Sequence, residues 1–318
     1  MCLYPRLLSN PKYKKNQKNG GLIPPVNDKR VLLVPIGCGN CIECRKQKAR
    51  QWQVRLLEDI KHNKNGKFIT LTFSNESIKK LIKYEKTFTD KQTKKEYKLS
   101  LKNLEGYELD NQIATVSVRL FMERWRKKYK KTLRHWFVTE LGHQGTENIH
   151  IHGIVWGDNI LNKKTNKIIN IYDEIKSIWQ YGYIWPREHQ YKETYVNNRT
   201  INYIIKYVNK IDEKHKAYKS IILTSPGIGG MYTKSQNSKN NKYKGIDTIE
   251  TYRTSSGHKI NMPIYWRNKL YTDEEREKLW IEKINKQERW ICGEKVDISQ
   301  GENEYYKLLE YYKEKNKK

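Results

Sequence analysis

Three short segments of the chain combine β-forming residues with a hydrophobic pattern that is typical of strands. Residues 68–73 alternate apolar and polar side chains, and residues 135–140 and 149–156 form two further runs. Alternation with a period of two buries one face of a strand, so each run is predicted to form a strand. Gly142 and Gly145 lie between the second and third runs, at a spacing that predicts a hairpin.

Most of the remaining hydrophobic positions follow a spacing close to the helical repeat. This spacing predicts helices over residues 44–62, 113–131, 171–180 and 199–211. The strongly charged stretch 79–110 is expected to hold a helix followed by an exposed connection, and residues 220–232 are rich in turn-forming residues. Residues 273–290 again have helical spacing, so the segment 271–318 is predicted to be a charged helical extension.

The charge of the chain indicates the kind of partner that it binds. Lys and Arg number 63 against 35 Asp and Glu, which gives a formal net charge of +28. An excess of this size favours a polyanion, with nucleic acid as the first candidate; a generally basic proteome with many solvated lysines is the alternative. Tyr (23) and Trp (9) outnumber Phe (5), which favours rings that can stack on bases while a polar edge stays in water.

The N-terminal region lacks the pattern of an exported protein. Residues 1–30 are rich in Lys, Asn, Gly and Pro and are expected to form a mobile basic arm. No stretch here or elsewhere has the apolar length of a signal sequence or a membrane span. The chain has 5 cysteines, too few for a disulfide scaffold, so we expect a soluble protein of a reducing cytoplasm without a membrane partner.

Two histidines in the third predicted strand form a candidate metal site. Successive side chains of a strand point to opposite faces, so His150 and His152 share one face while their apolar neighbours point toward a core. A hairpin brings Glu140 near the pair, which gives nitrogen and oxygen ligands suited to Mg²⁺ or Mn²⁺. His143 in the loop is a weaker substitute. The alternative is one solvated and one hydrogen-bonded histidine.

Two tyrosines one helical turn apart form a candidate pair of nucleophiles. In a helix over residues 199–211, Tyr203 lies over Tyr207, about 6 Å away along the axis, and Lys206 lies over Lys210 on the adjoining face. A phenol becomes a usable nucleophile toward a phosphodiester when a cation favours its phenolate and a metal withdraws charge from the phosphate. The alternative is an amphipathic helix whose tyrosines pack on the sheet.

Three clustered cysteines form a second candidate metal site. Cys38, Cys41 and Cys44 have the two-residue gaps of a metal-binding motif. A closed structural Zn²⁺ site requires four ligands, and Cys2, Cys292 or a histidine would have to complete it. Reduced cysteines at the entrance of a helix are the alternative.

The order of these features resembles the HUH superfamily of rolling-circle replication initiators. The strand 68–73, the pair His150 and His152 around one hydrophobic residue, and the pair Tyr203 and Tyr207 look like its three motifs. The double tyrosine with interleaved lysines is similar to the initiators of microviruses. Three further segments resemble the gokushovirus branch of these phages most closely: 38–47, 140–142 and 225–230.

This resemblance implies an α+β fold with a central antiparallel sheet and flanking helices, as in the HUH and RRM-like core. An endonuclease domain over residues 31–270 would then lie between the arm and the C-terminal extension. The resemblance also implies a role for each residue of the two constellations: metal binding for His150, His152 and Glu140, alternating attack for Tyr203 and Tyr207, and contacts with phosphate or phenolate for Lys206 and Lys210.

The implied reaction is the nicking and rejoining of single-stranded DNA at a phage origin through a 5′-phosphotyrosine, without a nucleotide cofactor. Host DNA polymerase and helicase are the implied partners, in the cytoplasm of the host cell. A plasmid relaxase or transposase of the same superfamily is one alternative. A non-enzymatic, basic single-stranded-DNA-binding protein is the other, because charge and aromatic content would suffice for it.

Overall fold

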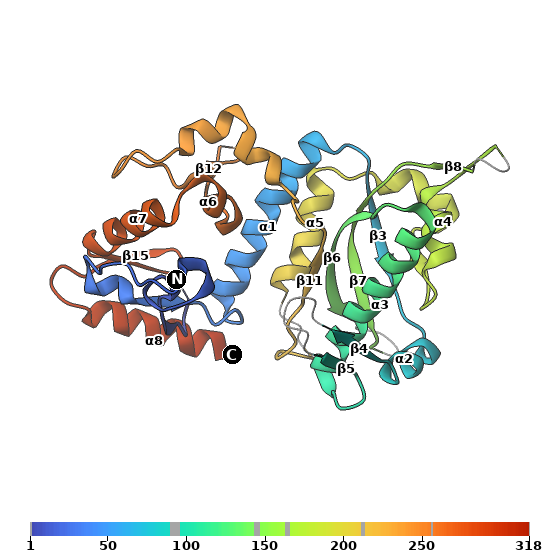
Figure 1. The fold of residues 1–318 in the computed structure, drawn as a ribbon, viewed down its shortest axis with the longest axis horizontal. Coiled ribbons are helices and arrows are strands. Elements are labelled where there is room, and N and C mark those ends of the chain that lie inside the picture. The colour runs from blue at the N-terminus through green and yellow to red at the C-terminus, as the bar shows by residue number, and fades with distance from the viewer. Residues whose placement is uncertain are drawn as a thin grey trace. The chain divides into compact units, whose positions relative to one another are not determined.

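The computed structural model describes residues 2–89, 96–142, 147–162, 166–210, 214–255 and 257–317. The chain divides into two compact units (Figure 1), a first unit of Met1–Val54 with Gly230–Lys318 and a second unit of Arg55–Gly229. The boundary falls inside helix α1 (Ile42–His62). The two ends of the chain therefore share one unit, and the expected boundaries at residues 30 and 270 stay a prediction.

The second unit is built on a five-stranded antiparallel sheet. Its strands, in spatial order, are β10 (Ile184–Trp185), β3 (Gly66–Leu71), β7 (Ile149–Trp156), β6 (Arg134–Leu141) and β11 (Ile222–Thr224). The three runs that alternate in the sequence form its centre, because the side chains on both of their faces are covered. The predicted α+β class with a central antiparallel sheet is confirmed.

Helices cover both faces of this sheet. The helices of the second unit, besides the end of α1, are α2 (Asn75–Ile82), α3 (Gly106–Tyr129), α4 (Ile171–Ile178) and α5 (Asn198–Asn209). One face contributes Ile69, Phe137 and Ile151 to a core that includes Phe121 of α3 and Ile175 of α4. The opposite face meets α5, which packs on β6. Figure 1 shows α3 and α5 on the two sides of the sheet.

The four helices predicted from periodicity are present as α1, α3, α4 and α5. The expectation for residues 79–110 is wrong in part, because a hairpin of β4 (Glu85–Thr89) and β5 (Glu96–Ser100) lies between α2 and α3. Phe88 is paired with Tyr97 in its register, and such cross-strand aromatic pairs stabilise a hairpin despite many lysines. Residues 220–232 likewise contain the short edge strand β11 besides their turns.

Smaller elements complete the second unit. They are the hairpin of β8 (Ile160–Asn162) and β9 (Lys167–Ile169), and the 3₁₀ helix η4 (Glu188–Thr194). Among the residues that the structure describes, no helix is long and apolar enough to cross a membrane.

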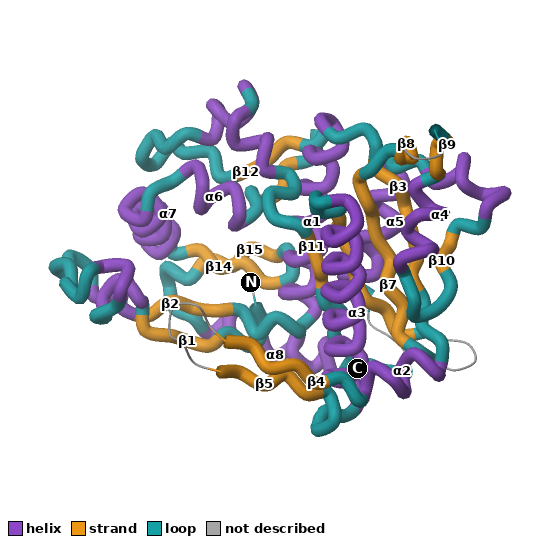
Figure 2. Tube along the Cα trace, turned by 45° about the vertical axis from the view of Figure 1, so that its right-hand side comes forward, coloured by secondary structure: helices purple, strands orange, loops and turns teal. Residues whose placement is uncertain are grey.

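The first unit gathers short elements from both ends of the chain. They are β1 (Arg6–Ser9), β2 (Leu33–Ile36), β12 (Thr251–Arg253), β13 (Lys259–Asn261), β14 (Glu288–Ile291), β15 (Glu294–Asp297), α6 (Ile264–Leu270), α7 (Asp273–Asn285) and α8 (Asn303–Lys317), with the 3₁₀ helices η1 (Pro11–Tyr13), η2 (Gln17–Asn19), η3 (Lys29–Leu32), η5 (Gly230–Lys234) and η6 (Gln236–Asn241). Each strand in this group pairs with its neighbour in the chain order, as Figure 2 shows in orange.

Both ends of the chain contribute regular elements to this unit. The segment 1–30 contains β1, which pairs with β2, and three 3₁₀ helices begin within it, so its described residues form regular local structure. The C-terminal extension is helical except for the β14–β15 hairpin. Its turn consists of Cys292 and Gly293, both with positive φ (50° and 99°), as tight hairpins require. Glycine at the second position is the usual signal for such a turn, but cysteine at the first is not.

Gly153 permits the close pairing of the central strands. A Cβ at this position of β7 would lie 2.1 Å from the Trp136 carbonyl oxygen and 2.9 Å from Phe137 Cα in β6. We expect Gly153→Ala to lower the free energy of unfolding by about 2 kcal/mol or more, because backbone atoms of β6 would have to move. Urea unfolding followed by tryptophan fluorescence measures this loss.

Gly157→Ala is the matched control, since its Cβ would meet only the ends of the Ile171 and Leu133 side chains, at 3.2 and 3.4 Å. Flexible side-chain ends can adjust, so the loss should be clearly smaller. Equal unfolding midpoints for Gly153→Ala and the parent protein would contradict this account of the sheet.

Candidate active site

The register of the central strands gathers polar side chains on the sheet face that α5 covers. In the β6–β7 ladder Glu140 lies opposite His150, and in the β3–β7 ladder Thr70 lies opposite His152. Because side chains alternate along a strand, all four share one face. The predicted hairpin therefore brings the carboxylate beside the His pair, as the sequence indicated.

His152 is held by hydrogen bonds on both ring nitrogens. Its Nε2 lies 2.8 Å from Oε2 of Glu140, and its Nδ1 lies 2.9 Å from the Thr70 hydroxyl. An ionised carboxylate can only accept, so Nε2 carries the proton and Nδ1 accepts from Thr70. This pair of contacts fixes the orientation of the ring.

Glu140 is also bound by a lysine of α5. Lys210 Nζ lies 2.6 Å from the second carboxylate oxygen of Glu140, whose side chain is only 14% exposed. Burial acts to raise the pKa of Glu140, but the hydrogen bonds from His152 and Lys210 outweigh it and lower the pKa below its ordinary value. Glu140 is therefore an anion at neutral pH, and Lys210 links the end of α5 to β6.

Local sequence explains why α5 presents its tyrosines to this face. The Asn197 side chain accepts hydrogen bonds from the backbone N–H groups of Arg199 and Thr200, which caps the start of the helix. Apolar residues at helical spacing bury one side of it: Ile201, Ile204, Ile205 and Val208. Tyr203 and Tyr207 lie one turn apart beside this buried stripe, at its border with solvent.

The two tyrosines contact each other, and Tyr207 contacts His152. The Tyr207 ring stacks on the His152 ring with centroids 4.2 Å apart and planes 3° from parallel. The Tyr207 hydroxyl donates to the Tyr203 hydroxyl at 2.6 Å. Tyr203 in turn packs edge-on against Phe68 of β3, at 5.9 Å between centroids. Burial, followed by the hydrogen bond with Tyr203, raises the pKa of Tyr207 above its ordinary value.

His150 lies at the edge of this group. Its ring centroid is 6.3 Å from that of His152, and the two planes are nearly perpendicular at 83°. Burial, followed by the proximity of His152, lowers the pKa of His150, so its imidazole is neutral at neutral pH. A neutral imidazole is the form that binds a metal ion.

The structure thus brings together Glu140, His152, Tyr203, Tyr207 and Lys210, with His150 adjacent. Lys206 is exposed on α5, and His143 lies outside the described residues. In the part of the chain that is described, the ligand atoms of His150, His152 and Glu140 do not all lie within 4.8 Å of one another; such a set occurs only among four cysteines of the first unit.

A pocket of about 430 Å³ opens beside Tyr203. It is lined by Phe68, Thr70, Trp185, Thr194, Tyr195, Arg199, Thr200 and Tyr203. Aromatic rings with a nearby guanidinium suit a nucleotide, because bases stack on rings and phosphates bind arginine. Nothing in the sequence singled out Trp185, Tyr195 and Arg199, because they belong to no motif. Thr70 could have been predicted as a site residue, because Phe68 and Thr70 lie on the same face of an alternating strand.

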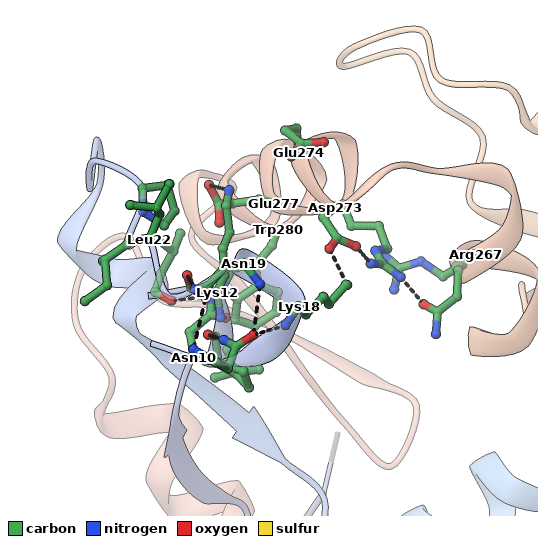
Figure 3. Close-up of a pocket in the computed structure, with 18 of the residues that line it drawn as sticks. Asn10, Lys12, Lys18, Asn19, Leu22, Arg267, Asp273, Glu274, Glu277 and Trp280 are labelled. Atoms are coloured by element: carbon green, nitrogen blue, oxygen red, sulfur yellow. Dashed lines mark hydrogen bonds and ion pairs between the residues drawn. The ribbon is translucent and has the colours of Figure 1, made fainter. Parts of the chain in front are cut away.

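A larger cavity of about 790 Å³ lies in the first unit (Figure 3) and is less suited to nucleic acid. Lys12 Nζ lies 3.0 Å from a Glu277 carboxylate oxygen, and Lys18 Nζ lies 2.6 Å from one of Asp273. Because carboxylates neutralise these lysines within its lining, a phosphate would meet anions as well as cations there. The pocket beside Tyr203 is therefore the better candidate for the substrate.

Comparison with known proteins gives one match. Residues 66–212 match a family model of replication-associated proteins of the ORF2 type. The matched segment begins at β3 and ends just after α5, so it contains every residue of the site just described. This match covers less than half of the chain, and over that segment it supports a likeness to rolling-circle replication initiators and a role in the initiation of replication. No curated protein and no solved structure matches the chain.

Removing the charge of Glu140 tests the electrostatics of the site. The pKa of Glu140 is lowered in the folded chain, so its carboxylate stabilises the fold above the unfolded pKa of about 4.3, and this stabilisation is lost as the pH falls through the folded value. We expect Glu140→Gln to lower the free energy of unfolding by about 1 kcal/mol near neutral pH. The difference in this free energy between the variant and the parent should shrink in acid. Urea unfolding at a series of pH values in EDTA measures both effects.

Glu147→Gln serves as the control for this substitution. Glu147 contacts Lys214 Nζ at 2.8 Å and His215 Nε2 at 3.2 Å, but the Glu147 and Lys214 side chains are exposed. Its loss should leave the free energy of unfolding unchanged within error. A Glu140→Gln effect that does not vary with pH would contradict the assignment.

Proposed function

We propose that the second unit nicks and rejoins single-stranded DNA at a replication origin and so initiates rolling-circle replication. The observation that carries this proposal is the stacking of Tyr207 on His152, with centroids 4.2 Å apart. A pair of phenols on a helix thereby lies over a histidine and a carboxylate on a sheet, and these are the groups needed to transfer a phosphoryl group to tyrosine. The match to a replication-associated family over the same residues is independent support.

Tyr203 is the first nucleophile in this proposal. It is 47% exposed and lines the pocket, whereas Tyr207 is half-buried. Because the pKa of Tyr207 is raised by burial and by its hydrogen bond, this phenol stays protonated. It donates to the Tyr203 oxygen, and a donated hydrogen bond stabilises a phenolate there.

The reaction exchanges one phosphodiester for another. The Tyr203 oxygen forms a bond to phosphorus while the bond from phosphorus to O3′ breaks. The phenolic proton leaves the site, and the departing oxygen takes up a proton to become a free 3′-OH for DNA polymerase. After one circuit Tyr207 attacks the regenerated origin, and the newly released 3′-OH closes a circle by attacking the first phosphotyrosine. Since the diester energy is kept, no nucleotide cofactor is required.

A divalent cation, Mg²⁺ or Mn²⁺, would be held by His150, His152 and Glu140 and would withdraw charge from the scissile phosphate. The donor set fits, because it combines two imidazole nitrogens with a carboxylate. Thr70 holds Nδ1 of His152 and turns Nε2 toward Glu140. As a ligand through Nε2, His152 would carry its proton on Nδ1 and donate it to the Thr70 hydroxyl, which would then be its outer partner.

The two lysines have different roles in this proposal. Lys210 contacts Glu140 and so holds the carboxylate in place from the end of α5. Lys206 is exposed one turn earlier on the same helix, where a DNA phosphate can reach it. An exposed lysine pairs with phosphate as a mobile point charge, which neutralises the strand as it bends toward Tyr203.

The pocket beside Tyr203 would receive the nucleotide next to the scissile bond. Trp185 and Tyr195 offer rings for a base, and Arg199 offers a guanidinium for a phosphate. A base held there would fix the position of the adjoining phosphate relative to Tyr203, and such fixed positioning accelerates attack.

A cleavage assay tests the proposed function. Labelled oligonucleotides that tile the single-stranded genome encoding this chain are mixed with protein and Mn²⁺ and separated on a denaturing gel. We expect one oligonucleotide to give a free 3′ end and a protein-linked 5′ fragment. EDTA, or His150→Ala with His152→Ala, should abolish cleavage, as should Tyr203→Phe with Tyr207→Phe.

Tyr183→Phe is the control for the tyrosine variants, because Tyr183 is an exposed tyrosine (85%) of the same unit that does not line the pocket. Its adduct should match that of the parent. DNA binding by the parent without any adduct would favour the non-enzymatic single-strand binder. A covalent adduct that forms only on the double-stranded DNA of a plasmid or transposon would favour a plasmid relaxase or transposase.

The pocket beside Tyr203 leads to a separate prediction about the binding of single-stranded DNA. In the Tyr203→Phe, Tyr207→Phe background, we expect Trp185→Ala to weaken single-stranded DNA binding about tenfold, or about 1.4 kcal/mol, through the loss of one stacked base. Fluorescence anisotropy with a labelled oligonucleotide measures the dissociation constant. Trp290→Ala is the control, since Trp290 is 50% exposed and belongs to the first unit. Equal weakening by both substitutions would contradict the pocket's assignment.

A further inference from the structure

Four cysteine sulfurs converge in the first unit, outside the proposed active site. The Sγ atoms of Cys2, Cys38, Cys41 and Cys44 all lie within 4.8 Å of one another. Cys2 Sγ lies 3.8 Å from Cys41 Sγ, and Cys38 Sγ lies 4.0 Å from Cys44 Sγ. All four are free thiols. We infer that these four cysteines form a structural Zn²⁺ site, and this inference does not depend on the proposed function.

The spacing of the sulfurs matches tetrahedral zinc. With Zn–S bonds of about 2.3 Å, the edge of a ZnS₄ tetrahedron is about 3.8 Å long. The pairs Cys2–Cys41 and Cys38–Cys44 already have this length within a few tenths of an ångström. A disulfide would require about 2.05 Å instead. The sulfurs are therefore arranged around a common centre rather than bonded in pairs.

Backbone N–H groups point at two of the four sulfurs, those of Cys2 and Cys38. The Cys2 sulfur accepts from Cys38 N at 3.2 Å and from Tyr4 N at 3.3 Å. The Cys38 sulfur accepts from Cys41 N at 3.3 Å and from Asn40 N at 3.4 Å. Outer donors of this kind orient metal ligands and stabilise their charge.

Positive charge beside the cysteine cluster would compensate the negative charge of the thiolate ligands. Four thiolates around Zn²⁺ carry a net charge of −2, which requires cations or dipoles nearby in a partly buried site. Arg45 is 7% exposed and interacts electrostatically with Cys41. Its guanidinium also binds the carbonyl oxygen of Asn40 at 2.9 Å and the Asn40 side chain at 2.8 Å, which holds the loop between two ligands. Cys44 lies in the first turn of α1, whose dipole also favours an anion.

The site joins segments that are distant in the sequence. Cys2 comes from the N-terminus and the other ligands from the entrance of α1. They adjoin a small core that contains Leu3 and four residues of the C-terminal segment: Ile291, Val296, Tyr305 and Leu309. A core of this size stabilises little by itself, so a metal would contribute much of the local stability. Because four protein ligands leave no open position, the site is structural. Binding converts thiols to thiolates, releases their protons to solvent and changes no oxidation state.

Metal analysis of the full-length chain tests this inference. The protein is expressed with added Zn²⁺, purified under reducing conditions and assayed by plasma mass spectrometry. We expect one tightly bound Zn²⁺ per chain, and loss of most of it in each of Cys2→Ser, Cys38→Ser, Cys41→Ser and Cys44→Ser. Cys292→Ser is the matched control, since Cys292 borders the same core but is not in the set, and it should retain its Zn²⁺.

Cobalt substitution covers the case in which a serine variant does not fold. Co²⁺ added to the refolded parent chain should give the intense visible bands of a tetrahedral ion with four thiolates. A parent chain that holds no Zn²⁺ and gives no such bands would overturn the site. Disulfide bonds between Cys2 and Cys41 and between Cys38 and Cys44, found by alkylation under non-reducing conditions, would also overturn it. A Cys292→Ser variant that loses as much Zn²⁺ as the other serine variants would do the same.

Discussion

The antiparallel pairing of β6 with β7 is the constraint on which the proposed site depends. It sets Glu140 opposite His150 and puts His152 on the same face, where Thr70 of β3 contacts it. A register shift of one residue would turn Glu140 to the face occupied by the apolar core. Gly153 lets the two strands approach at this point, so packing in the centre of the sheet determines the position of the polar groups.

Helix α5 adds the second half of the site with few residues. Its apolar stripe anchors it to the sheet, Lys210 binds Glu140 at its end, and Tyr207 stacks on His152. These contacts make the positions of the phenols dependent on the same strands that hold the carboxylate and the imidazoles. Tyr203 remains accessible because it lies on the solvent side, where it borders the aromatic pocket. A packed phenol and an accessible phenol thus lie one turn apart on the same helix.

Local patterns predicted the parts of this site, and long-range contacts determined the rest. Alternation located the central strands, and helical periodicity put Tyr203 over Tyr207. The sequence could not indicate that Lys210 binds Glu140, because 70 positions separate them. Cys2 was one of several candidates for the fourth ligand, since only the fold brings it to the Cys38 loop. The β4–β5 hairpin was missed because its many lysines resemble an exposed connection.

The central claim is that the imidazole pair, the carboxylate and the tyrosines act on one phosphate. The most direct measurement is a crystal structure of the Tyr203→Phe, Tyr207→Phe chain with Mn²⁺ and an uncleaved origin strand, in which anomalous scattering locates the metal. The account predicts Mn²⁺ bound by His150, His152 and Glu140 and by an oxygen of the scissile phosphate, with the ring at position 203 facing phosphorus. A manganese ion elsewhere, or a strand that passes the sheet without approaching α5, would contradict it.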